Sequence, residues 1–228
     1  MEAIACSGVP TQLLIAPLIV ALGWAPAPIG GRVTLPLVAP LLLIDTVVLV
    51  AMMVFFTRRR DESVRELWLG SRPKIREALT GVALIPLVFL SVVVLLNLLR
   101  VLAPALRSVP VNPMEQMATQ GLRDALLFAF VAIVGGGVRE ELQRAFMLRR
   151  FERYLGGPAV GVIVLSVAFG LGHWNQGYDA VIVTGTLGAC WAVVYLRRRS
   201  VLAPMVSHAG FNTIEVLSVA LLSGRPAG

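Results

Sequence analysis

The chain has 228 residues, of which 57% are hydrophobic and only 14% charged, and its mean hydropathy is +0.81. A soluble domain has about a quarter charged residues, so this composition excludes an ordinary soluble protein and predicts an all-α, polytopic helical membrane protein. The net charge of +7 comes from 19 arginines and one lysine. Arginine-rich loops are typical of the cytoplasmic side of a membrane protein, and no basic stripe interleaved with aromatic residues indicates nucleic-acid binding.

Long apolar stretches predict six to seven transmembrane helices, at 11–27, 35–56, 80–103, 122–148, 158–176, 179–196 and 200–223. The first is the weakest because Pro17, Pro26 and Pro28 interrupt or end it, and without it six spans remain. Asp45 stands alone in the second span. We expect it to pair with an arginine of another helix or to be protonated.

Fifteen of the twenty basic residues lie in three segments, 57–79, 139–156 and 197–199. These segments alternate along the chain with segments poor in Lys and Arg, so the positive-inside rule places all three at the cytoplasmic face. The first segment contains Leu67-Trp68-Leu69 between charged residues, which predicts a short amphipathic stretch on the membrane surface. With seven spans, the N-terminus is cytoplasmic as well.

The span at 122–148 contains charged residues, which are costly in a membrane and default to a functional hypothesis. Glu140 and Arg144 are four residues apart on one helical face, where they can pair, whereas Glu141 points about 100° away. Gly135-Gly136-Gly137 precede the two acids. These glycines either permit close helix packing or loosen the helix.

Both histidines of the chain lie in later spans, in the patterns Phe169-x-x-x-His173 and His208-x-x-x-Asn212. An asparagine amide and a histidine can each donate a hydrogen bond to a developing oxyanion. Since His208 and Asn212 are four residues apart, they share one face of the last helix.

The depth of the polar residues follows from the arginines that mark the cytoplasmic ends of the spans. Glu140 is nine residues before Arg149, and His208 is nine residues after Arg199. At 1.5 Å per residue both lie about 13 Å inside the membrane, so an acid and a histidine are predicted at one depth. His173 lies farther along its helix and must be brought level by tilt or by a late helix start.

These residue types are suited to hydrolysis. A carboxylate with a histidine can deprotonate a water, while the other histidine and the asparagine polarise a carbonyl group, which together suffice to cleave a peptide bond. Glu140, His173 and His208 could also hold Zn²⁺, although no His-Glu-x-x-His motif is present. No other cofactor is indicated.

At these residues, over about 120–220, the chain resembles the CPBP family of intramembrane endopeptidases, which contains the type II CAAX prenyl endopeptidases and the bacteriocin-processing and immunity proteins. The family pattern is Glu-Glu-x-x-x-Arg, then Phe-x-x-x-His, then His-x-x-x-Asn/Asp/Ser. The second and third motifs fit fully, but Glu140-Glu141-Leu-Gln-Arg144 is one residue short. If the chain is aligned on Arg144, Arg139 and Glu140 stand at the positions of the family's two glutamates. If it is aligned on Glu140 and Glu141, Arg144 stands one residue before the position of the family's arginine.

The resemblance implies that Glu140 or Glu141 activates water with His173 as its partner. It further implies that His208 and Asn212 stabilise the oxyanion. Arg144 and Phe169 are then supporting residues. Between the two acids we favour Glu140, because its depth matches that of His208. Family members are described both as metalloproteases and as metal-free glutamate proteases, so the metal status is left open.

We divide the single membrane domain into residues 1–119, the N-terminal helices and a cytoplasmic loop, and residues 120–223, the catalytic core. The resemblance implies an integral protein of the bacterial cytoplasmic membrane that contacts the lipid bilayer and cleaves a membrane-associated protein or peptide, with or without a lipid modification. The alternative is an inactive immunity or partner-binding protein of the same fold. The lack of an inverted repeat argues against a transporter, and the oligomeric state is left open.

Overall fold

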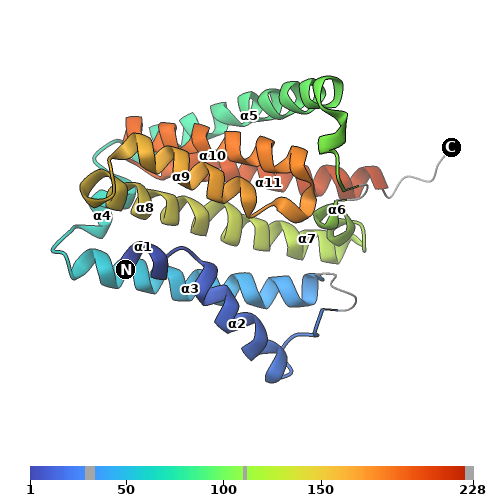
Figure 1. Ribbon diagram of the computed structural model, residues 1–228, viewed down its shortest axis with the longest axis horizontal. Coiled ribbons are helices and arrows are strands. Elements are labelled where there is room, and N and C mark those ends of the chain that lie inside the picture. The colour runs from blue at the N-terminus through green and yellow to red at the C-terminus, as the bar shows by residue number, and fades with distance from the viewer. Residues whose placement is uncertain (29–33, 110–111, 224–228) are drawn as a thin grey trace.

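The computed structural model describes residues 1–28, 34–109 and 112–223, and all regular structure within these residues is helical, as predicted (Figure 1). The helices in chain order are α1 (Glu2–Ala5), α2 (Val9–Ala21), α3 (Leu35–Arg58), α4 (Val64–Leu69), α5 (Lys74–Leu102), η1 (Pro104–Leu106), α6 (Pro113–Ala118), α7 (Leu122–Val131), η2 (Ala132–Glu140), α8 (Glu141–Tyr154), α9 (Pro158–Leu171), η3 (Trp174–Gln176), α10 (Tyr178–Arg198) and α11 (Leu202–Ser223).

Five helices of the described ranges are long and apolar enough to cross a membrane: Glu2–Ala21, Leu35–Arg59, Lys74–Leu102, Tyr178–Arg198 and Leu202–Leu222. Helix α5 buries few of its side chains, and large apolar residues such as Leu87, Leu90 and Val101 are exposed on it. An apolar surface of this size suits lipid rather than water. The protein is therefore an integral, polytopic helical membrane protein.

Two further predicted spans differ from a regular long helix. The stretch predicted as 122–148 is one continuous helix formed by α7, η2 and α8, which together run from Leu122 to Tyr154. The stretch predicted as 158–176 is shorter than expected, because α9 ends at Leu171 and a 3₁₀ turn follows. This early end places His173 in the turn rather than in the helix.

The continuous helix of α7, η2 and α8 runs through the middle of the bundle and is called the central helix below (Figure 1). Helix α11 packs against the central helix at η2 and α7, and also against α5. Helices α9 and α10 form an antiparallel hairpin beside α8, and α3 packs on the central helix with α2 outside it (Figure 1). The central helix thus has an α11 side and an α3 side.

The end of the bundle that holds most of the arginines also holds the N-terminus. Glu2 forms ion pairs with Arg60, at 2.7 Å, and with Arg150, at 2.9 Å. The predicted surface stretch is the short helix α4, which begins where the hydroxyl of Ser63 accepts a hydrogen bond from the backbone N–H of Glu66 at 3.2 Å. A serine that caps the first turn in this way stabilises a helix by about 1 kcal/mol.

Candidate active site

The two acidic residues lie where the central helix changes its winding. The η2 segment is a π-helix of nine residues that ends at Glu140, and the regular α8 begins at Glu141. Glycines have low helix propensity, and three of them lie inside η2. A Cβ atom built on Gly137 would lie 2.5 Å from the Cβ of Ala209, so α11 approaches the backbone of η2 closely. This close approach agrees with the prediction that the glycines permit tight helix packing.

Glu141 is held firmly on the α11 side. Its side chain is 1% exposed, and its Oε1 atom accepts hydrogen bonds from the guanidinium of Arg144 and from Nδ1 of His208, the latter at 2.8 Å. Among the described residues, its other oxygen, Oε2, is buried without a hydrogen-bond partner. The opposite charge of Arg144 compensates a carboxylate that would otherwise be costly to bury.

The pairing of Arg144 corrects one prediction. We expected Arg144 to pair with Glu140 at four residues' spacing, but it pairs with Glu141 at three. Residues three and four apart both share a helical face, so the spacing alone could not separate the two acids. The change from π to α winding falls between them, and His208 fixes the carboxylate of Glu141 beside Arg144.

Glu140 is held less tightly than its neighbour. Its side chain is 20% exposed, and its Oε1 atom accepts a hydrogen bond from Nη2 of Arg139 at 3.3 Å. Its other oxygen lies 3.9 Å from Nε2 of His208, which is beyond a direct hydrogen bond. A water molecule can bridge two polar atoms at such a separation. The prediction that Glu140 and His208 meet inside the bundle agrees with this geometry.

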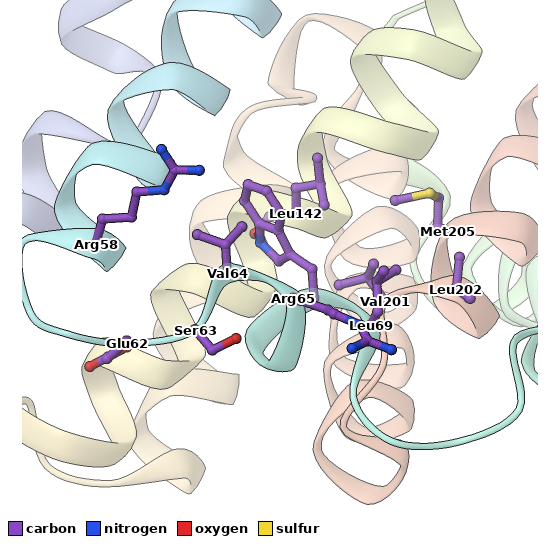
Figure 2. A pocket seen from close by; sticks show the side chains of 11 residues that line it. Arg58, Glu62, Ser63, Val64, Arg65, Leu69, Leu142, Val201, Leu202 and Met205 are labelled. Atoms are coloured by element: carbon purple, nitrogen blue, oxygen red, sulfur yellow. The ribbon is translucent and has the colours of Figure 1, made fainter.

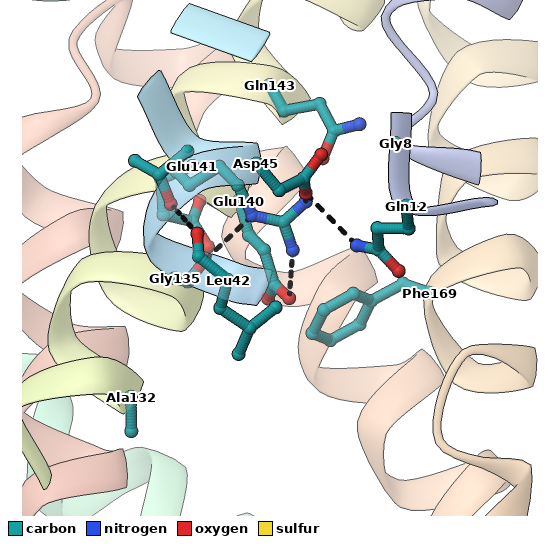
Figure 3. A network of polar contacts seen from close by, with 12 residues as sticks. Gly8, Gln12, Leu42, Asp45, Ala132, Gly135, Glu140, Glu141, Gln143 and Phe169 are labelled. Carbon is teal, nitrogen blue, oxygen red and sulfur yellow. Dashed lines mark hydrogen bonds and ion pairs between the residues drawn. The ribbon is translucent and has the colours of Figure 1, made fainter. Parts of the chain in front are cut away.

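Arg139 is shared with a second carboxylate, that of Asp45 on α3 (Figure 3). Its Nη1 atom lies 3.1 Å from Oδ2 of the fully buried Asp45, which also accepts hydrogen bonds from the Thr11 hydroxyl and from Nε2 of Gln12. The predicted pairing of Asp45 with an arginine of another helix is confirmed. Helices α2 and α3 therefore help to place the cation that contacts Glu140.

The ring of His208 is fixed by three contacts. Nδ1 faces Glu141, one face of the ring stacks on Trp191 with the centroids 3.9 Å apart, and Phe169 meets the ring edge-on at 6.0 Å. The indole of Trp191 donates a hydrogen bond to the hydroxyl of Ser207 at 3.3 Å. With Nδ1 engaged and the ring unable to turn, Nε2 is the nitrogen presented toward Glu140.

His173 contacts Phe169, the same aromatic residue that contacts His208. Its ring contacts that of Phe169 with the centroids 4.8 Å apart, and its Nδ1 atom is 2.8 Å from the backbone carbonyl oxygen of Phe169. A carbonyl oxygen can only accept, so Nδ1 donates and Nε2 is the nitrogen that can take up a proton. Within the described part of the chain, no hydrogen bond or ion pair joins His173 to Glu140 or Glu141.

Asn212 lies over the backbone of η2, one helical turn beyond His208. Its amide donates to the carbonyl oxygen of Ala132 at 3.4 Å. A Cβ atom built on Gly136 would lie 2.5 Å from the amide nitrogen of Asn212. The absence of a side chain at Gly136 therefore leaves room for the amide over η2, where Nε2 of His208 also approaches Gly136.

The described residues do not form a metal site: no group of three or more His, Cys, Asp or Glu side chains is placed to hold an ion. The set considered from the sequence was Glu140, His173 and His208. Nδ1 of His173 is bonded to the Phe169 carbonyl oxygen and Nδ1 of His208 to Glu141. In each ring Nε2 is therefore the nitrogen that could bind a metal ion.

Several site residues could not be recognised from the sequence. Trp191 and Ser207 orient His208, and Thr11 and Gln12 hold Asp45. In a sequence, neither a tryptophan in an apolar helix nor a threonine near the start of one indicates a functional site. Only a buried carboxylate such as Asp45 signals that partners must exist.

Taken together, the fold and the site define a class: a polytopic membrane protein whose bundle brings a buried carboxylate–histidine pair beside a second, partly exposed carboxylate. Residues 122–214 match the family model of the Rce1-like proteins, described as type II CAAX prenyl endopeptidases. This match agrees with the resemblance to the CPBP family, and the family that it names is one of proteases. Comparisons with curated proteins and with solved structures gave no match.

Proposed function

We propose that this protein is an intramembrane endopeptidase that hydrolyses a peptide bond of a membrane-associated protein or peptide at the bacterial cytoplasmic membrane, by a glutamate-activated water. The observation that supports this most strongly is the position of Glu140. Its partly exposed carboxylate lies 3.9 Å from Nε2 of a histidine that is otherwise immobilised. The five residues predicted from the sequence to be catalytic, Glu141 among them, all lie within the matched segment.

The proposed reaction begins with a water held between Glu140 and His208. Glu140 takes one proton from the water as its oxygen attacks the carbonyl carbon of the scissile bond. The oxyanion that forms accepts hydrogen bonds from the amide of Asn212 and from Nε2 of His208. In this scheme Nε2 carries a proton, and the Glu141 carboxylate holds the second proton of the ring on Nδ1. Glu140 then returns the proton to the leaving nitrogen, the C–N bond breaks, and a carboxyl and an amino terminus are released.

Glu141 has a different role in this scheme. Its carboxylate already accepts from Arg144 and His208, so it keeps Nδ1 of His208 protonated and the ring in place rather than activating water. His173 presents Nε2 on the far side of Phe169. We assign it a supporting role as a second proton acceptor in the wall of the site.

The proposal is tested on membranes of cells that produce the wild type, Glu140→Gln or Glu152→Gln. Glu152 lies on the same central helix, at its charged end, and serves as the matched control. Mass spectrometry of protein termini should show new termini with the wild type and the control that are missing with Glu140→Gln. The same termini in all three samples would contradict a peptidase that uses Glu140.

A second candidate is a non-catalytic immunity or partner-binding protein of the same fold. The separation of His173 from both glutamates favours it. It predicts that a cellular phenotype of the protein survives in both His173→Ala and Glu140→Gln. The peptidase proposal predicts that the phenotype is lost with Glu140→Gln.

A further inference from the structure

A groove of about 640 Å³ opens at the arginine-rich end of the molecule (Figure 2). It lies between the end of α3, helix α4, the start of α8 and the start of α11. Its floor is mostly apolar and is built by seven side chains: Val64, Trp68, Leu69, Leu142, Val201, Leu202 and Met205. An apolar floor of this kind suits a hydrocarbon ligand.

Most polar groups of the lining are already engaged. The carboxylate of Glu62 accepts from Arg150 at 2.9 Å and from Arg153 at 2.6 Å. The indole N–H of Trp68 donates to the carbonyl oxygen of Leu142 at 3.3 Å. Ser63 also lines the groove, and its hydroxyl accepts from the first turn of α4. These groups therefore offer little to a new polar ligand.

The two arginines of the lining differ from the other groups. Arg58, from α3, and Arg65, from α4, are both exposed, and neither has a side-chain hydrogen bond or ion pair with any residue that the structure describes (Figure 2). Elsewhere at this end, Arg150 and Arg199 are each paired with a carboxylate. The groove thus combines an apolar floor with two free guanidinium groups on its rim.

The level of the groove indicates where such a ligand comes from. The three arginine-rich segments face the cytoplasm, and the groove lies at their end of the bundle, beside the surface helix α4. The headgroups of the cytoplasmic leaflet lie at this level, and anionic lipids of that leaflet bind basic pockets between transmembrane helices.

We propose that the groove binds an anionic phospholipid of the cytoplasmic leaflet, with its headgroup at the rim that carries Arg58 and Arg65 and an acyl chain along the apolar floor. A peptide substrate is a less suitable occupant, because the lining leaves few free groups to pair with a peptide backbone. The groove also lies on a different face of α8 from the catalytic residues: Leu142 contributes to its floor, while Glu141 contacts His208.

The test is native mass spectrometry of the purified full chain with added phosphatidylglycerol or phosphatidylcholine of identical acyl chains. The wild type should retain phosphatidylglycerol more strongly. The double variant Arg58→Gln/Arg65→Gln should weaken phosphatidylglycerol binding by roughly 25-fold, from about fivefold for each cation at a lipid surface. Phosphatidylcholine binding should change little.

Two further variants separate a built site from general attraction. Arg59→Gln/Arg76→Gln removes two exposed arginines of the same end that do not line the groove, and it should leave phosphatidylglycerol binding within twofold of wild type. Met205→Trp, or Leu202→Trp if the first fails to fold, should fill the floor and weaken binding of both lipids.

The proposal is overturned if the wild type retains both lipids equally, or if the control pair loses as much binding as the groove pair. It is also overturned if a filled floor leaves phosphatidylglycerol binding unchanged. A photocrosslinker at position 205 that captures a peptide rather than phospholipid in membranes would show that the groove has another occupant.

Discussion

The two neighbouring glutamates of the central helix differ in how firmly their carboxylates are held. On the α11 side, Glu141 is 1% exposed and bound by both Arg144 and His208. On the α3 side, Arg139 is divided between Asp45 and Glu140, and the Glu140 carboxylate remains 20% exposed. The difference teaches that two adjacent residues of identical chemistry can be given a tightly bound and a more accessible carboxylate by their partners alone, which is the basis of the roles proposed for them.

The winding of the helix makes this separation possible. Successive residues of a helix point about 100° apart, and here the change from η2 to α8 falls between the two acids. Single-turn π segments occur frequently at functional sites. In this protein the π segment brings Gly136 under Asn212 and Gly137 against Ala209, so that α11 closes one side of the site.

The largest expected difference between the two acids is in stability. Glu141→Gln leaves the buried Arg144 without its counter-charge, and removal of one partner of a buried ion pair costs about 3–5 kcal/mol. Glu140→Gln removes a partly exposed carboxylate and should cost less than about 1 kcal/mol. Denaturation of both variants in detergent measures the two losses. Equal losses of stability in the two variants would show that Glu141 is not held more firmly than Glu140.

The packing of the two sides can be tested with glycines of η2. A methyl group on Gly137 would lie 2.8 Å from the Cα of Ala209, whereas one on Gly135 would be 3.4 Å from the side chain of Leu42 on α3. Gly137→Ala should therefore lower the free energy of unfolding by about 1–3 kcal/mol through overpacking. Gly135→Ala is the matched control and should be nearly neutral. A larger loss for Gly135→Ala would mean that the α3 side is the tighter one.

The α3 side should influence activity through Asp45. With Asp45→Asn, Arg139 loses a carboxylate partner and is free to move with Glu140, and a misplaced catalytic group costs roughly ten- to a hundredfold in rate. Gln12→Ala removes another contact of Asp45 without touching Arg139, so it should reduce kcat by less than about threefold. The kcat values of these variants, measured on folded protein, provide the test. Unchanged kcat in Asp45→Asn would limit Asp45 to a structural role.

The smallest expected effect lies at the charged end of the central helix, outside the membrane-spanning part. The hydrogen bond from Arg199 lowers the pKa of Glu152 below its usual value, and Arg149 adds to this. Because the folded-state pKa is the lower one, this stabilisation is present above the unfolded pKa of about 4.3. It is lost as pH falls through the folded-state pKa.

Wild type should therefore lose up to about 1 kcal/mol more stability than Glu152→Gln between pH 6 and pH 3, as expected for an exposed pair. Thermal unfolding across this pH range measures the difference. Parallel pH curves for the two proteins would show that the pair contributes nothing.

Much of the architecture could be predicted because it follows from solvation. Apolar length located the spans, and the cost of a buried carboxylate predicted a cationic partner for Asp45. The cytoplasmic orientation expected from the arginines remains a prediction. The partner of Arg144 could not be predicted, because a π segment changes which residues share a face and has no clear sequence signature. The position of His173 depends on where α9 ends, and helix ends are set by local capping and packing rather than by hydrophobicity.

The central claim is that Glu140, rather than Glu141, activates the water. The most direct measurement is kcat for a substrate identified from the membrane comparison, with wild type and Glu140→Gln reconstituted in the same lipid. We predict that Glu140→Gln stays folded and loses activity by about 10²–10⁴-fold, the usual contribution of a general base. A folded Glu140→Gln protein that cleaves at close to the wild-type rate would contradict the account.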